Sequence, residues 1–335
     1  MVAIALITGI TGQDGSFLTD LLLEKGYEVH GVVRRSSSLE RSRLAHLYAN
    51  PQIYKRLFLH YADLDDPTTL RRVITQVRPH ELYHLAGQSH VGLSFDIPET
   101  TCSFTAMGTL RLLEILRDLE HPPRLFHATS SEIFGNPEQV PQDERTPMAP
   151  INPYGCAKAF ATQMVAIYRQ SYKLFAVNGI LYNHESPRRG EHFVTRKICR
   201  AAAAIKLGRQ QKLTLGDTSA QRDWGHAKDT VRGMWLSLQH EKPNDYVFAT
   251  GQLHRVQDVL EIAFDTLGLD WRKHLDVDPY LMRAAEPLHL VGDASNARAV
   301  LGWAPCIGFE ELIQEMTMSE FQSLEAGGKN QGATR

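Results

Sequence analysis

The sequence predicts an α/β fold in which a doubly wound parallel sheet is accompanied by a smaller α/β substrate-binding domain. Three observations predict it: short apolar runs alternate with helical patterns, a glycine-rich turn joins the first such pair, and the alternation loosens past about residue 180. Repeated strand–helix alternation is typical of a parallel sheet covered on both faces. Ligands of such sheets bind beyond the carboxyl ends of the strands, so the residues after each strand are the candidates for function.

The elements follow from the apolar pattern along the chain. We expect strands at 2–8, 27–33, 57–61, 81–85, 124–129, 174–180 and 246–249. We expect helices at 15–25, 67–77, 105–119, 154–172, 195–207, 227–240, 256–267 and 309–324. The polar, Gly-rich residues 326–335 are expected to form a disordered tail.

Glycines at 9, 12 and 15 stand between the first expected strand and helix. Gly9 allows a sharp turn, Gly12 lets the backbone approach a pyrophosphate, and Gly15 allows the helix to pack closely on the strand. A tight turn without a ligand also needs glycine, so the spacing alone leaves both interpretations open. With the alternation it predicts a Rossmann-type domain over 1–180, with returning segments near 224–250, and a discontinuous substrate domain mainly over 181–325.

Composition excludes several classes of protein. The 335 residues are 43% hydrophobic. Their net charge of −2 lacks the excess of Lys and Arg that is typical of nucleic-acid-binding proteins. No apolar stretch approaches the about 20 residues that a membrane span needs. The four cysteines are far apart without metal-ligand spacing, which favours free thiols in a reducing compartment. We therefore expect a cytoplasmic enzyme that binds no metal, nucleic acid or membrane.

The residues after the second and third strands favour NADP as the cofactor. Residues 34–37 read Arg-Arg-Ser-Ser, where an NAD enzyme has an acid for the ribose 2′-hydroxyl. Guanidinium and hydroxyl groups suit a 2′-phosphate instead, although a solvated basic loop is the alternative. Asp63 can accept from adenine, cap the next helix, or do both.

The residues that can carry chemistry follow the fifth strand. Tyr154 and Lys158 are four apart, so they lie on one face of a helix. We expect the ammonium to lower the pKa of the phenol, nominally about 10, so that the phenolate can take a hydroxyl proton. Ser130 and Glu132 end the strand. Taken singly, these residues are also typical of a half-buried helix face, a capping hydroxyl and a surface carboxylate.

The combination resembles the extended short-chain dehydrogenase/reductases, and among them the 4,6-dehydratases that act on GDP-sugars, from about residue 3 to about residue 320. The most specific match is 178–197, supported by 222–227 and 301–303. The resemblance implies NADP and GDP-mannose. The alternatives are another GDP-sugar, such as a GDP-heptose, and a catalytically idle NADP-binding scaffold. It also implies a homodimer or homotetramer.

The resemblance implies a reaction in three stages. Tyr154 takes the proton of the C4 hydroxyl while hydride passes from C4 to NADP. Glu132 then removes the acidified C5 proton, and water leaves from C6. Hydride returns to C6. An epimerase needs no second acid–base group there, so Glu132 distinguishes a dehydratase.

The resemblance also carries sets of site residues. The catalytic set is Ser130, Glu132, Tyr154 and Lys158. The cofactor shell comprises Gly9, Ile10, Thr11, Gly12, Gln13, Asp14, Gly15, Arg34, Arg35, Ser36, Ser37, Asp63, Leu64, Leu85, Ala86, Gly87, Gln88, Ser89, Thr100, Tyr154, Lys158, His184 and Arg189. The substrate wall comprises Ser89, Ser130, Glu132, Asn183, Val194, Lys197, Arg222, Arg283 and Glu286.

Particular roles and departures follow from the same resemblance. Lys197 and Arg222 are expected to hold the diphosphate, and Glu286 to accept from guanine. Ser130 stands where the family usually has Thr. Residues 287–289, Pro-Leu-His, also depart from the family pattern, so the choice of base and sugar stays open.

Overall fold

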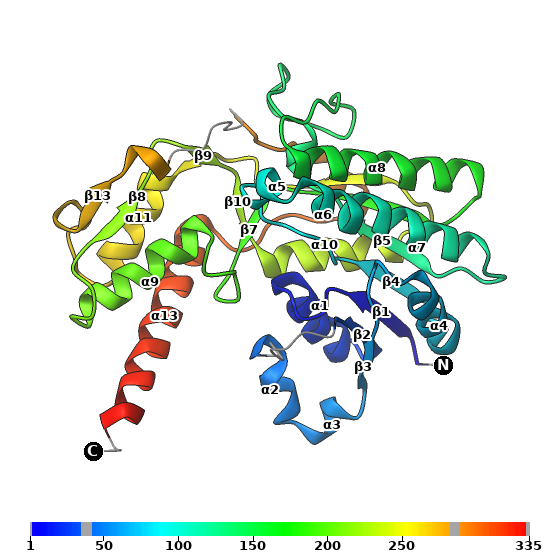
Figure 1. Ribbon diagram of the computed structural model, residues 1–335, viewed down its shortest axis with the longest axis horizontal. Helices are drawn as coiled ribbons and strands as arrows, with labels where there is room; N and C mark the ends of the chain where they lie inside the picture. The colour runs from blue at the N-terminus through cyan, green and yellow to red at the C-terminus, as the bar shows by residue number, and fades with distance from the viewer. Residues whose placement is uncertain (1, 35–41, 282–288, 333–335) are drawn as a thin grey trace.

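A computed structural model of the chain describes residues 2–34, 42–281 and 289–332. A seven-stranded sheet in the order β11-β6-β5-β4-β1-β2-β3 forms its centre (Figure 1), and neighbouring strands are parallel throughout. The strands are β1 (Ile4–Thr8), β2 (Glu28–Val33), β3 (Leu57–Tyr61), β4 (Glu81–His84), β5 (Arg124–Ala128), β6 (Ala176–Leu181) and β11 (Asp245–Phe248). The predicted fold class is confirmed.

Helices cover both faces of this sheet. Side chains alternate across a strand, so Ala5 and Ile7 join one buried cluster while Leu6 joins the other. The first cluster is covered by α1 (Gln13–Glu24), α10 (Ala227–Gln239) and α12 (Ser295–Leu301). The second is covered by α4 (Pro67–Val77), α7 (Gly108–Arg117) and α8 (Pro153–Ser171). Both faces of β1 are buried, which explains its continuous apolar run.

The strand order reverses between β1 and β4. The chain runs from β1 through β2 to β3 at one edge, and then returns to place β4 on the other side of β1. The residues after β1 and those after β4 therefore emerge side by side at the same end of the sheet. This switch point is where a doubly wound sheet binds its ligand.

A second group of elements packs beside the sheet. The helices α9 (Val194–Lys206), α11 (Val256–Thr266) and α13 (Phe309–Gly332) share a separate buried cluster and lie together on the left in Figure 1. Three two-stranded sheets accompany them: β7 (Asn183–Glu185) with β10 (Trp224–His226), β9 (Gln221–Arg222) with β12 (His254–Arg255), and β8 (Leu213–Leu215) with β13 (Leu275–Val277).

The backbone departs from the sequence expectations in several places. The expected helix at 105–119 begins as a π-helix, η2 (Ser103–Met107), and the C-terminal helix continues to Gly332. This helix includes 326–332, part of the segment 326–335 for which a disordered tail was expected. The short elements not predicted are η1 (Ser42–Leu44), α2 (Ala45–Tyr48), α3 (Pro51–Tyr54), α5 (Leu93–Asp96), α6 (Pro98–Cys102), η3 (Ser131–Ile133), η4 (Trp271–Lys273) and η5 (Pro279–Leu281).

Within the described ranges, no helix combines the length and the apolar character needed to span a membrane.

Candidate functional site

The glycine turn after β1 is closed by backbone contacts that exclude larger residues. Gly9 has a φ of +76°, and a Cβ there would lie 2.8 Å from the Ala86 nitrogen after β4. A Cβ on Gly15 would lie 2.3 Å from the Gly9 carbonyl oxygen. Gly12 is the N-cap residue of α1 and has no side chain to fill the space before the helix. The turn thus presents the N-terminal N–H groups of α1 at the switch point, as an anion site requires.

Two side chains at the start of α1 connect the turn to β7. Gln13 donates from Nε2 to the His184 carbonyl at 3.0 Å, and Asp14 pairs with the His184 ring at 2.8 Å. Arg189, also predicted for the cofactor shell, pairs with Glu185 at 3.0 Å and lies over the Phe193 ring. The structure therefore brings the predicted residues of the first turn and of 184–189 together.

The loop after β4 contains buried polar atoms without partners. Among the described residues, Gln88 Oε1 and Thr105 Oγ1 are buried and have no hydrogen-bond partner. A Cβ on Gly87 would lie 3.5 Å from that Thr105 oxygen and 3.9 Å from Lys158 Nζ. Orphaned polar atoms and an ammonium around a glycine fit the hydroxyls and amide of a dinucleotide.

The predicted catalytic residues meet at the junction of β5 and α8. Tyr154 and Glu132 are each 8% exposed, and the Ser130 hydroxyl lies close enough to the phenol to favour its ionised form. The Ser130 oxygen also accepts from the Glu132 N–H at 3.3 Å, since Ser130 is the N-cap of η3. A phenol, a hydroxyl and a carboxylate therefore share one small buried volume.

The expected lowering of the Tyr154 pKa is wrong for this structure. Burial raises the pKa of Tyr154 to about 12, with the Ser130 hydrogen bond opposing and the Glu132 charge reinforcing the rise. The Lys158 ammonium donates to the Ala128 carbonyl at 2.6 Å, and burial lowers its pKa to about 8. Burial, which sequence spacing does not report, is the largest cause of the Tyr154 shift, and the charges that act with it are those of Glu132, Arg189 and Asp14.

Asn152 is a functional candidate that the sequence analysis missed. It caps α8 by accepting from the Gly155 N–H at 2.7 Å, and its Nδ2 donates to Glu132 Oε2 at 2.8 Å. The signal available in the sequence was Asn before Pro at the start of a helix, which predicts a cap but not a carboxylate partner.

The predicted substrate residues lie farther out. Arg222 is buried on β9, with its Nη1 donating to the Gln221 carbonyl at 2.6 Å, whereas Lys197 is exposed on α9 and donates to the Thr214 carbonyl at 2.8 Å. Val194 begins α9 and Asn183 begins β7.

Asp223, next to Arg222, was also missed. Its carboxylate accepts from the N–H groups of Thr250, Gly251 and Gly292 at 2.9, 2.9 and 3.2 Å. The side chain thereby fastens β9 to the loop after β11.

The remaining predicted residues have fewer contacts with the other residues of the predicted site. Asp66, not Asp63, caps α4. Leu64 packs in the sheet core, Ser89 and Thr100 are exposed, and the Arg34 guanidinium lies 5.7 Å from the centre of the Phe104 ring. Predicted residues outside the described part of the chain are Arg35, Ser36, Ser37, Arg283 and Glu286.

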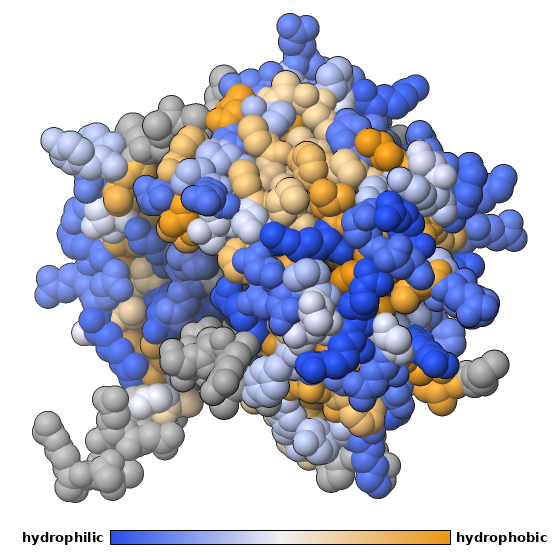
Figure 2. All heavy atoms as spheres, turned by 45° about the vertical axis from the view of Figure 1, so that its right-hand side comes forward, coloured by the Kyte–Doolittle hydropathy of each residue, from blue (hydrophilic) through white to orange (hydrophobic). Residues whose placement is uncertain are grey.

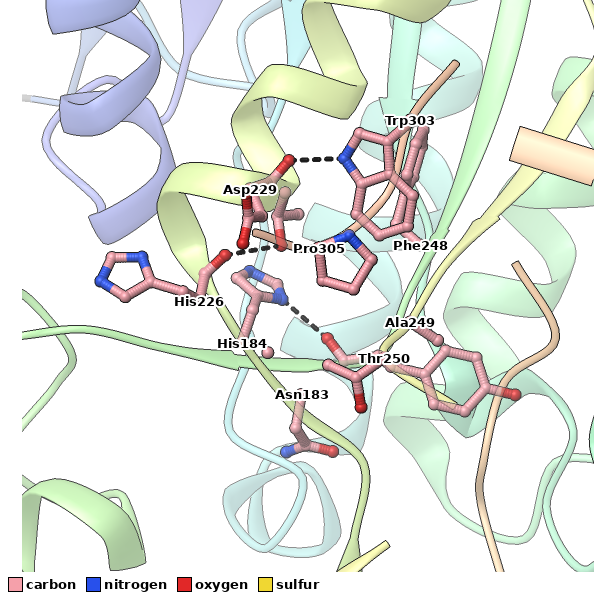
Figure 3. Close-up of a pocket in the computed structure, with 12 residues that line it drawn as sticks. Asn183, His184, His226, Asp229, Phe248, Ala249, Thr250, Trp303 and Pro305 are labelled. Atoms are coloured by element: carbon pink, nitrogen blue, oxygen red, sulfur yellow. Dashed lines mark hydrogen bonds between the residues drawn. The ribbon is translucent and has the colours of Figure 1, made fainter. Parts of the chain in front are cut away.

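Two hollows lie near β7 and β10. The first, shown in Figure 3, is lined by Asn183, His184, Asp229 and Trp303 and has a volume of about 10 Å³, the space of a single water. The second, about 210 Å³, lies against Trp224 and contains no predicted site residue in its lining. Neither hollow is the dinucleotide site that the switch point defines.

Comparison with known proteins identifies the family. The family model described as GDP-mannose 4,6 dehydratase matches residues 6–316. GDP-mannose 4,6 dehydratase 2 of Arabidopsis thaliana is 52% identical over 325 residues, covering 95% of this chain and 87% of that protein. The GDP-mannose 4,6 dehydratase of Homo sapiens is 47% identical over 340 residues, covering 95% and 91%.

Solved structures agree on the fold. The UDP-glucose 4-epimerase of Thermus thermophilus in complex with NAD has a TM-score of 0.81 at 26% identity, covering 95% of this chain and 99% of that one. A dTDP-glucose 4,6-dehydratase of Streptomyces venezuelae has a TM-score of 0.84 at 24% identity, covering 96% and 98%.

The sheet, the glycine turn and the helix with Tyr154 and Lys158 define an extended short-chain dehydrogenase/reductase, a class that works with a pyridine nucleotide. Within this class, the chain belongs to the GDP-mannose 4,6-dehydratase family. It is a nucleotide-sugar 4,6-dehydratase, and the predicted resemblance is confirmed.

Proposed function

We propose that the chain converts GDP-mannose to GDP-4-keto-6-deoxymannose with NADP as a cofactor that is restored in each turnover. The observation that carries this proposal is the buried Glu132 carboxylate beside Ser130 and the buried Tyr154 phenol. Loss of water from C5 and C6 needs a base for the C5 proton in addition to the group that serves the C4 hydroxyl. Tyr154 with Ser130 serves the C4 hydroxyl, and the Glu132 carboxylate is the base for the C5 proton.

Tyr154 acts on the C4 hydroxyl. In its ionised form, which the nearby Ser130 favours, its oxygen takes the hydroxyl proton as C4 becomes a ketone. The nearby Arg189 charge favours the phenolate, against the burial that disfavours it. NADP, when bound, supplies the acceptor that takes hydride from C4 and returns it to C6.

Glu132 acts on C5 once C4 is a ketone. The carboxylate removes the acidified C5 proton, the C6–O bond breaks, and the oxygen leaves as water with the proton that Tyr154 took from the C4 hydroxyl. C5 regains a proton when C6 is reduced. Atoms and electrons balance as the loss of one water, with no net change in the cofactor.

The preference for NADP rests on charge. Arg34 is exposed at the end of β2, where a 2′-phosphate of the adenine ribose would lie, and Arg35, Ser36 and Ser37 are proposed as its other ligands. Lys158, Gln88 and Thr105 are proposed to satisfy their free hydrogen-bonding capacity on the inner ribose and the nicotinamide. Comparing the affinities of the protein for NADP and NAD tests this part.

The preference for GDP-mannose rests on the relatives that carry that name and on two positively charged side chains, those of Arg222 and Lys197. Arg222 and Lys197 are proposed to bind the diphosphate, with Asn183 and Val194 beside the sugar. Arg283 and Glu286 are proposed to close over guanine.

The reaction is tested by incubating the protein with NADP and GDP-mannose, with a GDP-heptose in parallel, and following the product by NMR. We expect a new C6 methyl group and a C4 ketone from GDP-mannose. Turnover of the heptose alone would move the assignment to that sugar. Binding of NADP without turnover of either sugar would mean an idle scaffold.

A homodimer is proposed from an apolar surface. Met107 of η2 and Phe160 and Ile167 of α8 are 41%, 41% and 46% exposed. Figure 2 shows hydrophobic side chains gathered on the upper part of the face that carries these helices. Exposed apolar patches of this kind mark association surfaces. Sedimentation of the parent and of Ile167→Glu tests the homodimer.

The division into an NADP-binding and a substrate domain likewise stays a prediction.

A further inference from the structure

Asn152 joins the Glu132 carboxylate to the helix that carries Tyr154 and Lys158. Its side chain is 3% exposed, and it accepts from Gly155 while donating to Glu132. A backbone N–H only donates and an ionised carboxylate only accepts, so the amide has a single possible orientation. One side chain therefore both caps α8 and directs the carboxylate.

The backbone around this link is tightly packed. A Cβ on Gly155 would lie 2.5 Å from the Glu132 carbonyl oxygen, so the first turn of α8 rests on η3. Asn152 itself has the extended backbone of an N-cap residue, with φ −143° and ψ 158°. The distance between the amide and the carboxylate is therefore determined by two elements in contact.

We propose that Asn152 is a positioning residue for the dehydration step, which keeps Glu132 ionised and aimed at C5. This inference rests on the proposed role of Glu132. A hydrogen bond donated to the charged form of a carboxyl favours that form. The causes that shift the Tyr154 pKa include Ser130 but not Asn152, so we expect oxidation at C4 not to depend on the amide. Loss of the amide should thus slow the second step selectively.

The test uses Asn152→Ser, which keeps a capping oxygen but removes the amide donor. We expect the rate of cofactor reduction by GDP-mannose to stay within about twofold of the parent, while kcat falls about tenfold and reduced cofactor accumulates. The acid limb of the kcat profile should move up by about one pH unit, since the carboxyl is then harder to ionise. In Asn152→Asp, which keeps the shape and the cap, a second carboxylate should move the limb further.

A matched control is Asn296→Ser. The Asn296 amide donates to Glu144 at 3.3 Å, so the same kind of bond is lost among residues outside the predicted site. This variant should keep the parent kinetics. Parent kcat and an unmoved acid limb in both Asn152 variants would overturn the inference, as would reduction and dehydration slowing equally, which would indicate a helix cap alone. A parent protein that makes no 4-keto-6-deoxy product would overturn the proposed function itself, and this inference with it.

Discussion

His184 is held between two acceptors, and one of them is the Asp14 carboxylate. Its Nε2 lies 2.8 Å from Asp14 Oδ2, and its Nδ1 lies 2.7 Å from the Tyr182 carbonyl oxygen. Since both ring nitrogens must donate, the imidazole is doubly protonated. Burial opposes both charges, yet their mutual attraction raises the pKa of His184 and lowers the pKa of Asp14. This pair connects β7 to the first turn of α1.

Replacing one partner of this pair should destabilise the fold more than replacing both. His184→Asn leaves the Asp14 charge with little solvent, which costs about 3 kcal/mol of unfolding free energy. In the double variant with Asp14→Asn, no charge is left unpaired and most of that loss should be recovered. Urea unfolding at pH 6 of the parent, His184→Asn, Asp14→Asn and the double variant gives the coupling energy. A double variant no more stable than His184→Asn would contradict the pairing.

The same pair predicts a pH window for stability. The raised pKa of His184 stabilises the fold below its ordinary value of 6.5, and this is lost as the pH rises through the folded-state pKa. The lowered pKa of Asp14 stabilises it above 3.8, and this is lost as the pH falls. The difference in unfolding free energy between the parent and the double variant should therefore be largest between those two values. A difference independent of pH would mean that the pair is uncharged.

The two proton-transfer residues should separate kinetically. Glu132→Gln should allow GDP-mannose to reduce the cofactor but lower dehydration about 10²- to 10⁴-fold, because only the C5 base is missing. Tyr154→Phe should lose both steps, since the C4 hydroxyl then keeps its proton. Stopped-flow absorbance of the reduced cofactor and solvent-deuterium exchange at C5 measure the two steps. Near-parent turnover of Glu132→Gln would remove it as the C5 base.

We expect Lys158 to lower the unfolding free energy of the protein when no cofactor is bound. Its pKa falls from 10.5 to about 8, so the folded state binds the proton more weakly by about 3 kcal/mol. This penalty is complete below pH 8 and disappears as the pH rises to 10.5. Lys158→Met should therefore be inactive yet more stable than the parent at pH 7, by about 2 kcal/mol after loss of the bond to Ala128. Unfolding at pH 7 and pH 10.5 checks both the sign and the convergence of the two proteins.

The parts of the site that were predictable are those encoded by local spacing. Gly9 and Gly15 are read from a turn between a strand and a helix, and Tyr154 and Lys158 from one helical turn. The parallel sheet with helices on both faces followed from the alternation of apolar runs and helical patterns, whereas the strand order was not predicted.

The parts that escaped prediction depend on contacts between distant segments. Asn152 meets Glu132 across 20 residues, and Asp223 meets Gly292 across 69. The pKa of Tyr154 was expected on the wrong side of its ordinary value, because the spacing to Lys158 carries no measure of burial. Sequence spacing thus brought candidate groups together but did not report the burial that sets their protonation.

Gly15 offers a direct test of how closely the phosphate-binding helix must approach β1. In Gly15→Ala the methyl group would lie 2.3 Å from the Gly9 carbonyl oxygen and 2.6 Å from Ile10 Cα. Both are backbone atoms that cannot rotate away, so α1 must move outward and its N–H groups must leave the switch point. We expect a loss of about 2 kcal/mol of unfolding free energy and at least about tenfold weaker NADP binding.

The control for this substitution is Gly308→Ala, where an added Cβ meets nothing within 4 Å. Stability and NADP affinity should then stay near the parent values. If Gly15→Ala lost stability but kept its NADP affinity, the helix would have moved without disturbing the ligand, and the phosphates would not be bound at its N-terminus. If stability and NADP affinity fell together, both would depend on the close approach of the backbone at Gly15 to the Gly9 carbonyl oxygen. This is the outcome that the contact between Gly9 and Gly15 predicts.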